Sequence, residues 1–171
     1  MKFYPNMYQK NIHSIPYSKL KKMGIKCLVF DLDNTIALID QHMITDDTKK
    51  LLTNLKRDFQ VVIISNNVVK RVKTYANYLD CDYVANASKP LSKGYQKIRK
   101  RYHLKKEEMC MIGDQLITDI YGGNRYHIFT ILVDPLGKKD LKITGLNRFL
   151  ERKILKRYEE KGIMKKGEYY E

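Results

Sequence analysis

Short polar motifs directly follow apolar runs at several points of this sequence, and they hold the side chains most able to do chemistry. Two are carboxylates separated by one residue, one is a hydroxyl, one is an amine, and two more are carboxylates five residues apart. The set comprises Asp31, Asp33, Ser65, Lys89, Asp114 and Asp119. No single member is diagnostic, but the combination restricts the chemistry that the chain could support.

The combination favours phosphoryl transfer. Grouped carboxylates repel one another unless a cation neutralises them, and Mg²⁺ prefers such oxygen ligands. One carboxylate can attack phosphorus and form an aspartyl-phosphate, while a second, two residues away, protonates the leaving oxygen and later activates water. A hydroxyl, a lysine and turn amides can hold the phosphoryl oxygens as charge develops on them.

These side chains can act together only if the fold brings them to one place. Apolar runs typical of buried strands alternate with segments of helical periodicity. The predicted strands are 26–30, 60–64, 82–85, 109–112 and 128–133, and the predicted helices are 46–59, 68–79, 92–102, 117–125 and 145–160. This order predicts an α/β fold, a Rossmann-like parallel five-stranded sheet with helices on both faces. The motifs then follow the carboxyl ends of strands, where ligands bind in such sheets.

The motifs resemble those of the haloacid dehalogenase (HAD) superfamily of phosphatases. They are Phe30-Asp31-Leu32-Asp33-Asn34-Thr35, Ile64-Ser65-Asn66, Lys89-Pro90 and Gly113-Asp114…Asp119, and they occur in the order of the family. The resemblance implies that Asp31 is the nucleophile and Asp33 the general acid and base. It also implies that Ser65 and Lys89 are catalytic residues that bind the transferring phosphoryl group.

A Mg²⁺ cofactor is part of what the resemblance implies. The ligands would be Asp31, Asp33 through its carbonyl, and Asp114. Asp119 would orient the acidic end of the site or add a metal contact through water. Two simpler roles stay open for Asp119, namely capping a helix or pairing with Lys89.

Substrate contacts are expected around the same motifs. The candidate substrate-binding residues are Asn34, Thr35, Ser65, Asn66, Lys89 and Arg125. The asparagines could instead shape backbone turns, and Arg125 could belong to an ordinary helix end.

The spacing of the motifs predicts a site without a cap domain. Thirty-one residues separate Asp33 from Ser65 and 23 separate Ser65 from Lys89, which leaves room for about one helix and one strand in each gap. An uncovered site suits a large substrate such as a protein, a nucleic acid end or a lipid headgroup, unless a partner subunit supplies a lid. We expect one domain over 1–171, divided into a basic N-terminal arm (1–25), a catalytic core (26–135), a basic amphipathic C-terminal helix (136–160) and a loosely held tail (161–171).

Further segments resemble one group of small capless HAD proteins, the YqeG-like, IIIA subgroup. They include Tyr4-Pro5, Gly122-Gly123-Asn124-Arg125 and Asn147-Arg148…Glu151-Arg152. This subgroup is similar to the phosphatases that act on phosphatidylglycerophosphate. The resemblance therefore implies a lipid phosphatase that makes phosphatidylglycerol, although membership of a subgroup does not fix a substrate.

The positive charge of the chain is concentrated at its two ends. Lys and Arg total 33 and Asp and Glu 19, a net charge of +14. Residues 1–30 carry +6 and residues 136–171 carry +5, so the ends hold +11. Charge placed in this way indicates an anionic partner surface, although a solvated basic exterior is the simpler alternative.

Two basic segments are candidates for contact with an anionic membrane. One is the predicted helix over 146–158, whose apolar stripe comprises Leu146, Phe149, Leu150, Ile154, Leu155 and Tyr158. The other is the N-terminal segment with Phe3, Tyr4, Met7, Tyr8, Ile12 and Ile15. Each stripe could instead cover the domain itself.

The location expected from the sequence is the cytoplasm, with peripheral attachment to the inner face of the membrane. The sequence has no apolar run near the roughly 18 residues that span a bilayer and no signal-peptide pattern. Three distant cysteines argue for a reducing compartment.

The alternatives to a lipid phosphatase are a phosphatase for a soluble phosphate ester or phosphoprotein, or a basic nucleic-acid or ribosome-binding module. No RNA-stacking motif is visible, so no specific nucleic acid is expected.

Overall fold

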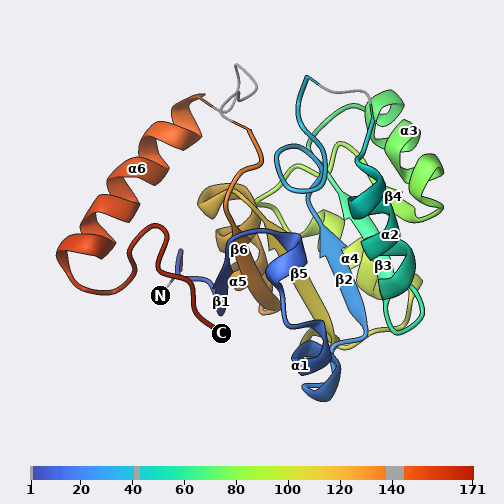
Figure 1. Cartoon of the computed structure of the whole chain (residues 1–171), viewed down its shortest axis with the longest axis horizontal. Coiled ribbons are helices and arrows are strands. Elements are labelled where there is room, and N and C mark those ends of the chain that lie inside the picture. Colours follow the sequence, from blue (N-terminus) through green and yellow to red (C-terminus); the bar gives the residue numbers. More distant parts are fainter. Residues whose placement is uncertain (1, 41–42, 138–144) are drawn as a thin grey trace.

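The structure is a computed structural model that describes residues 2–40, 43–137 and 145–171, except for the side chains of 145 and 146. Its centre is a six-stranded, fully parallel sheet with the strand order β1-β6-β5-β2-β3-β4 (Figure 1). The strands are β1 (Met7–Gln9), β2 (Cys27–Phe30), β3 (Gln60–Ile64), β4 (Asp82–Val84), β5 (Met109–Gly113) and β6 (Phe129–Val133). The predicted α/β class and parallel sheet are confirmed, with one strand more than expected.

Helices connect the strands and cover both faces of the sheet. They are α1 (Tyr17–Lys22), α2 (Asp46–Leu55), α3 (Val69–Leu79), α4 (Lys93–Arg101), α5 (Tyr121–Tyr126) and α6 (Gly145–Glu160). Short 3₁₀ turns occupy Ile12–Ser14 and Lys106–Glu108, and a π-helical turn occupies Leu116–Ile120. The predicted start of α2 is confirmed, because the Thr45 hydroxyl accepts a hydrogen bond from Thr48 N as an N-cap.

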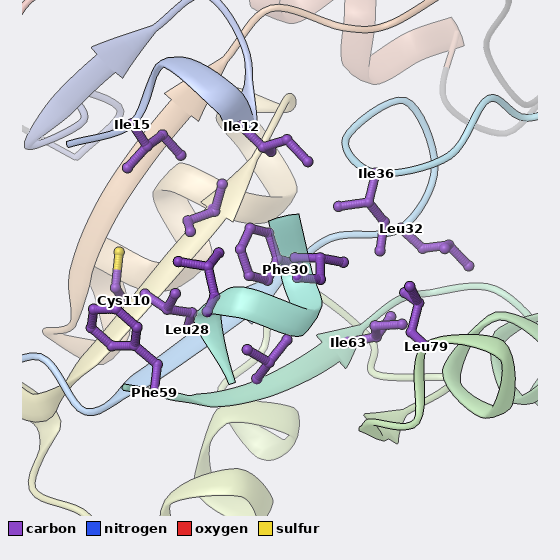
Figure 2. Packing of buried hydrophobic residues seen from close by; sticks show 14 of the residues in the cluster. Ile12, Ile15, Leu28, Phe30, Leu32, Ile36, Phe59, Ile63, Leu79 and Cys110 are labelled. Carbon is purple, nitrogen blue, oxygen red and sulfur yellow. The ribbon is translucent and has the colours of Figure 1, made fainter. Parts of the chain in front are cut away.

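Alternate side chains of the central strands fill two separate apolar layers. In β2, Leu28 and Phe30 face the layer that contains α1, α2 and α3, and several residues of this layer are shown in Figure 2. Val29 points to the opposite layer, which α4 and α5 cover. Successive residues of a strand point to opposite faces, so a strand covered on both sides is apolar throughout, as this run is.

The extra strand, β1, comes from the N-terminal segment that was predicted to be an arm. Met7 and Tyr8 pair with Ile131 and Leu132 of β6, and both side chains are buried. Ile12 and Ile15 are buried as well. The prediction that this apolar set contacts a membrane is therefore wrong for these four residues. A three-residue strand is too short to show a periodic pattern, so the sequence did not reveal it.

The C-terminal tail, predicted to be loosely held, is packed against β1. Tyr8 and Tyr170 exchange backbone hydrogen bonds of 3.0 and 2.9 Å in an antiparallel bridge. The Tyr170 ring stacks on Tyr4, with ring centroids 5.5 Å apart, and Met164 is buried. The tail thus satisfies the outer edge of the sheet, which would otherwise present free backbone groups.

Helix α6 has the bounds expected for the last helix, Gly145–Glu160. For the longer segment 136–160, residues 138–144 lie outside the described part of the chain. The predicted apolar stripe of α6 is divided. Ile154, Leu155 and Tyr158 pack against the domain, while Phe149 and Leu150 are exposed.

The segment predicted as one short helix over 117–125 is a π turn followed by α5. Helix α5 continues through Gly122 and Gly123 to Tyr126. A Cβ on Gly123 would overlap the side chain of Thr130 on β6. The glycines therefore serve close packing of α5 on the sheet.

The gaps between the motifs hold ordinary elements of the sheet. The described residues between Asp33 and Ser65 form α2 and β3 with their loops, and those between Ser65 and Lys89 form α3 and β4. Among the described residues, no helix has the length and apolar character needed to cross a membrane.

Candidate active site

The carboxyl edge of the sheet brings the four motifs together. Asp31 N extends the β2–β5 ladder with a hydrogen bond of 2.9 Å to Ile112 O, and Ser65 N bonds to Val84 O at 2.9 Å. These two motifs thus begin directly at the rigid ends of strands, and Lys89 follows β4 after a short loop, as expected for parallel strands whose carboxyl ends share one edge.

Lys89 is the centre of the group. Its Nζ lies 2.6 Å from Asp31 Oδ1 and 2.6 Å from Asp119 Oδ1, and it also donates to Ile64 O at 3.3 Å. The side chains of all three charged residues are less than 10% exposed. Such short, buried, charge-assisted bonds fix the ammonium between the two carboxylates.

Asn66 fixes the backbone that carries Lys89. Asn66 Oδ1 accepts a hydrogen bond of 2.6 Å from Lys89 N, and its Nδ2 donates to Lys89 O at 3.0 Å. Both polar groups of this side chain therefore face protein backbone, which matches the alternative in which Asn66 shapes a turn. Its predicted role in substrate binding stays a prediction.

Asp119 has the position of an orienting group. Its Oδ2 accepts from Gln115 N at 3.1 Å while its Oδ1 holds Lys89. Gly113 leaves the room that this carboxylate needs, because a Cβ there would overlap it. Since both oxygens of Asp119 already have protein donors, its main role in this geometry is to place Lys89.

Asp31 and Asp114 converge on Thr35. The Thr35 hydroxyl oxygen lies 3.4 Å from Asp31 Oδ2 and 3.2 Å from Asp114 Oδ1. One ligand oxygen from each of Asp31, Asp114 and Asp119 lies within 4.8 Å of the others. This buried, all-oxygen donor set fits a hard divalent cation such as Mg²⁺.

Burial shapes the ionisation of this group. It raises the pKa of Asp31 well above its ordinary value, against the opposing effect of Lys89. It raises the pKa of Asp114 to about 7, although Arg148 acts in the other direction. For Lys89, burial alone would lower the pKa, but the carboxylates of Asp119 and Asp31 hold it above its ordinary value. Three buried carboxylates, Asp31, Asp114 and Asp119, thus face two cations, Lys89 and Arg148, and a further cation would stabilise their ionised forms.

Asp33 is oriented by the start of α3. Arg71 donates to Asp33 Oδ1 from Nε at 3.0 Å and from Nη2 at 2.7 Å, and Asn67 Nδ2 donates to Oδ2 at 3.1 Å. The Ser65 hydroxyl accepts from Asn67 N at 3.1 Å. The second aspartate of the motif is therefore positioned independently of Asp31, by side chains from another strand–helix connection.

Two of the predicted substrate-binding residues, Asn34 and Arg125, have surroundings that differ from those of the Asp31 group. Asn34 is buried within the first motif and has a left-handed backbone with φ of 63°, a conformation that asparagine tolerates in turns. Arg125 is exposed on α5 and lines a separate pocket with Lys2 and His127. The structure does not bring Arg125 to the Asp31 group.

Arginines absent from the predicted site contact its carboxylates. Arg71 holds Asp33, and Arg148 of α6 pairs with the carboxylate of Asp114 and donates to its backbone carbonyl at 3.1 Å. Arg148 belongs to a segment predicted to be a basic amphipathic helix, but its side chain is only 14% exposed. The sequence offered a signal for only one of these two arginines. Arg71 is one helical turn beyond Asn67, at the start of a predicted helix, so a place near the motif could have been suspected for it.

A pocket of about 560 Å³ opens beside the carboxylate group, between the end of β6 and α6. Asp114 and its partner Arg148 lie on its boundary, so the pocket adjoins the carboxylate group at Asp114. Its apolar lining comes from Leu116, Leu132, Val133 and Leu155. Arg152 and Lys166 also line it, and neither forms an ion pair within the described part of the chain.

Comparison with known proteins assigns this fold and site to a class. Residues 36–127 match the haloacid dehalogenase-like hydrolase family, and the chain belongs to that family. The match begins after Asp31 and Asp33 and includes Ser65, Lys89, Asp114 and Asp119. A magnesium-bound HAD hydrolase, YfnB of Bacillus subtilis, has the same fold, with a TM-score of 0.56 and 16% identity over 69% of this chain and 90% of that chain.

Among curated relatives, this chain is 38% identical to the Bacillus subtilis (strain 168) protein named Probable phosphatase YqeG, over 94% of both chains. It is 26% identical to phosphatidylglycerophosphate phosphatase 1, chloroplastic/mitochondrial, of Arabidopsis thaliana, over 93% of this chain and 49% of that protein. The chain thus spans about half the length of the plant relative. The predicted enzyme class, a phosphatase, is confirmed by the family and by these relatives.

Proposed function

We propose that this protein is a Mg²⁺-dependent phosphatase that forms an aspartyl-phosphate on Asp31 and converts phosphatidylglycerophosphate to phosphatidylglycerol at a membrane surface. The observation that carries the chemistry is the arrangement around Asp31. Lys89 Nζ lies 2.6 Å from one carboxylate oxygen of Asp31, and the other oxygen faces the Thr35 hydroxyl, which also contacts Asp114. The nucleophile is thus fixed between an ammonium and an oxygen-rich cation site.

The chain's own residues supply the steps of this reaction. The Asp31 carboxylate attacks phosphorus, the bond between phosphorus and the ester oxygen breaks, and Asp33 in its protonated form gives its proton to the leaving oxygen. Asp33 then takes a proton from water, whose oxygen attacks the phosphorus and releases Asp31 and inorganic phosphate. Lys89 and the Ser65 hydroxyl neutralise and bind the phosphoryl oxygens.

The metal would be held by Asp31, the Asp33 carbonyl and Asp114. When bound, Mg²⁺ supplies charge neutralisation of the phosphoryl oxygens and of the attacking carboxylate. Arg71 and Asn67 would hold the Asp33 carboxylate in place while its backbone carbonyl contacted the metal.

The pocket beside Asp114 supports a lipid headgroup as substrate. Arg152 and Lys166 supply positive charge for a second anionic group, and the neighbouring leucines accept apolar parts of the leaving group. Phosphatidylglycerophosphate has a phosphomonoester, a glycerol and a phosphodiester in that order. The Arabidopsis thaliana relative named for this substrate supports the assignment, as does a net charge of +14, which favours association with anionic lipid.

Phosphate release from phosphatidylglycerophosphate, compared with a panel of soluble phosphate esters, tests the proposal. We expect the lipid to be preferred in kcat/KM, activity to vanish on chelation of Mg²⁺, and Asp31→Asn to be inactive with an unchanged circular dichroism spectrum. Arg125→Gln is the matched control, because Arg125 lies away from the site. A preference for a nucleotide, sugar phosphate or phosphopeptide would overturn the substrate, and turnover by Asp31→Asn would overturn the aspartyl-phosphate.

A further inference from the structure

Exposed apolar side chains gather on the edge of the sheet that carries the active site. Of the ten large hydrophobic residues that are exposed in the described part of the chain, seven follow the carboxyl end of a strand or lie in the first two turns of α6. These seven are Met43, Val68, Val69, Leu91, Leu136, Phe149 and Leu150. Single exposed hydrophobic residues are common, but their concentration around one site marks an interaction surface.

Four of the seven form two adjacent pairs, and each pair directly follows a residue that holds one of the site's carboxylates. The valine pair, Val68 and Val69, directly follows Asn67, which holds Asp33. The Phe–Leu pair, Phe149 and Leu150, directly follows the arginine that holds Asp114. The valine pair follows β3, and the Phe–Leu pair adjoins the arginine that holds Asp114 after β5, so the two pairs flank the carboxyl end of β2 from either side. The start of α6 lies at the same edge of the sheet as the loop after β2 (Figure 1).

Exposed cations accompany both pairs. Lys70 follows the valine pair, and Arg152 and Lys153 follow the Phe–Leu pair. Lys153 Nζ lies 4.5 Å from the centroid of the Phe149 ring. Apolar side chains beside lysine and arginine are the combination that binds the interface of an anionic bilayer.

Met43 differs, because the exposed carboxylates of Asp46 and Asp47 follow it at the start of α2. The surface around Met43 is therefore less suited to contact with an anionic membrane than the surfaces around the two pairs. The difference places the centre of the contact between α3 and α6 rather than over α2.

We propose that the valine pair and the Phe–Leu pair form a membrane-docking face that turns the Asp31 site toward an anionic bilayer. The inference rests on the proposed function, since a lipid substrate must reach Asp31 from the bilayer. It also replaces the N-terminal segment as the contact, because Met7, Tyr8 and Ile12 are buried. The headgroup then enters the pocket beside Asp114 while the acyl chains stay in the lipid.

The test compares paired variants on this face with a control on the opposite edge. The variants are Val68→Ser/Val69→Ser and Phe149→Ser/Leu150→Ser, and the control is Met23→Ser, at the end of α1. Met23 and Val69 are both 48% exposed. Serine at position 68 is also a good helix N-cap, so α3 should persist.

Binding is measured by flotation with phosphatidylcholine vesicles that contain or lack phosphatidylglycerol. We expect each paired variant to lower the partition coefficient for anionic vesicles about tenfold, because several buried methylene groups are lost. Met23→Ser should bind like the natural sequence. Hydrolysis of soluble p-nitrophenyl phosphate should be unchanged in all three.

The outcomes separate the docking face from the proposed function. Equal loss in Met23→Ser, no loss in either pair, or a natural protein that does not bind anionic vesicles would each overturn the docking face. In these cases, hydrolysis of detergent-dispersed phosphatidylglycerophosphate shows whether the proposed function survives. A natural protein that dimerises in sedimentation, and becomes monomeric in both paired variants, would assign the face to a second copy and would also overturn the inference.

Discussion

The guanidinium of Arg148, on α6, is ion-paired with the carboxylate of Asp114 at the end of β5. The Arg148 side chain is 14% exposed and that of Asp114 is fully buried. Arg148 also donates to Glu151 Oε2 at 3.0 Å, and Glu151 accepts from Ile117 N at 3.1 Å. The last helix is thereby attached to the residue that we assign to the metal, and it forms a wall of the pocket beside it.

Arg148→Met should destabilise the metal-free protein strongly. The carboxylates of Asp114 and Glu151 would remain buried without their cation, which typically costs about 3 kcal/mol or more. Mg²⁺ should reduce this loss, because a metal on Asp114 replaces part of the missing charge. Urea unfolding in EDTA and in Mg²⁺ measures both effects, with the exposed Arg157→Met as control. Equal losses in the two conditions would contradict the assignment of Asp114 to the metal.

The variants Asp119→Asn and Asp114→Asn should change different properties of the enzyme, the first kcat and the second the dependence on Mg²⁺. Asp119 holds Lys89, so its loss should lower kcat while leaving the Mg²⁺ concentration for half-maximal activity within about threefold of the original. Asp114→Asn should raise that concentration at least tenfold, since a ligand is removed. Mg²⁺ titrations of activity and of thermal unfolding distinguish the two. The reverse pattern would make Asp119 the metal ligand.

Gly113→Ala should impair catalysis through Asp119. The new Cβ would overlap that carboxylate and displace it from Lys89. We expect kcat to fall about tenfold or more, with a stability loss of about 1–3 kcal/mol as in other overpacked sites. Gly123→Ala is the matched control, because its Cβ would meet Thr130 instead. It should lose stability but keep kcat while folded, and an equal loss of kcat would refute the proposed route.

Removal of residues 163–171 should destabilise the domain by about 2–4 kcal/mol, because Met164 leaves an apolar cluster and β1 loses its cover. The midpoint of urea unfolding measures this change. Deletion of Glu171 alone should leave the midpoint unchanged, because its pair with Lys19 is exposed. An unchanged midpoint in the longer deletion would restore the earlier expectation of a loose tail.

The sequence by itself determined most of the sheet and the grouping of the polar motifs at its carboxyl edge. Five strands and the connecting helices follow from apolar runs and helical periodicity, because a strand buried on both faces must be apolar throughout. Asp31, Lys89, Asp114 and Asp119 could be grouped for the same reason, since each follows the end of a parallel strand and such ends share one edge.

Tertiary structure alone decided the contacts that link segments with no common pattern. The pairing of Met7–Gln9 with β6 and its bridge to Tyr170 join opposite ends of the chain. The pairs Arg71–Asp33 and Arg148–Asp114 span 38 and 34 residues. An arginine on a helix gives the same sequence signal whether it faces solvent or a buried carboxylate, because the charge of a residue does not specify which way its side chain points. Only the packing of α3 and α6 on the sheet turned these two arginines inward and left the valine and Phe–Leu pairs exposed around the site.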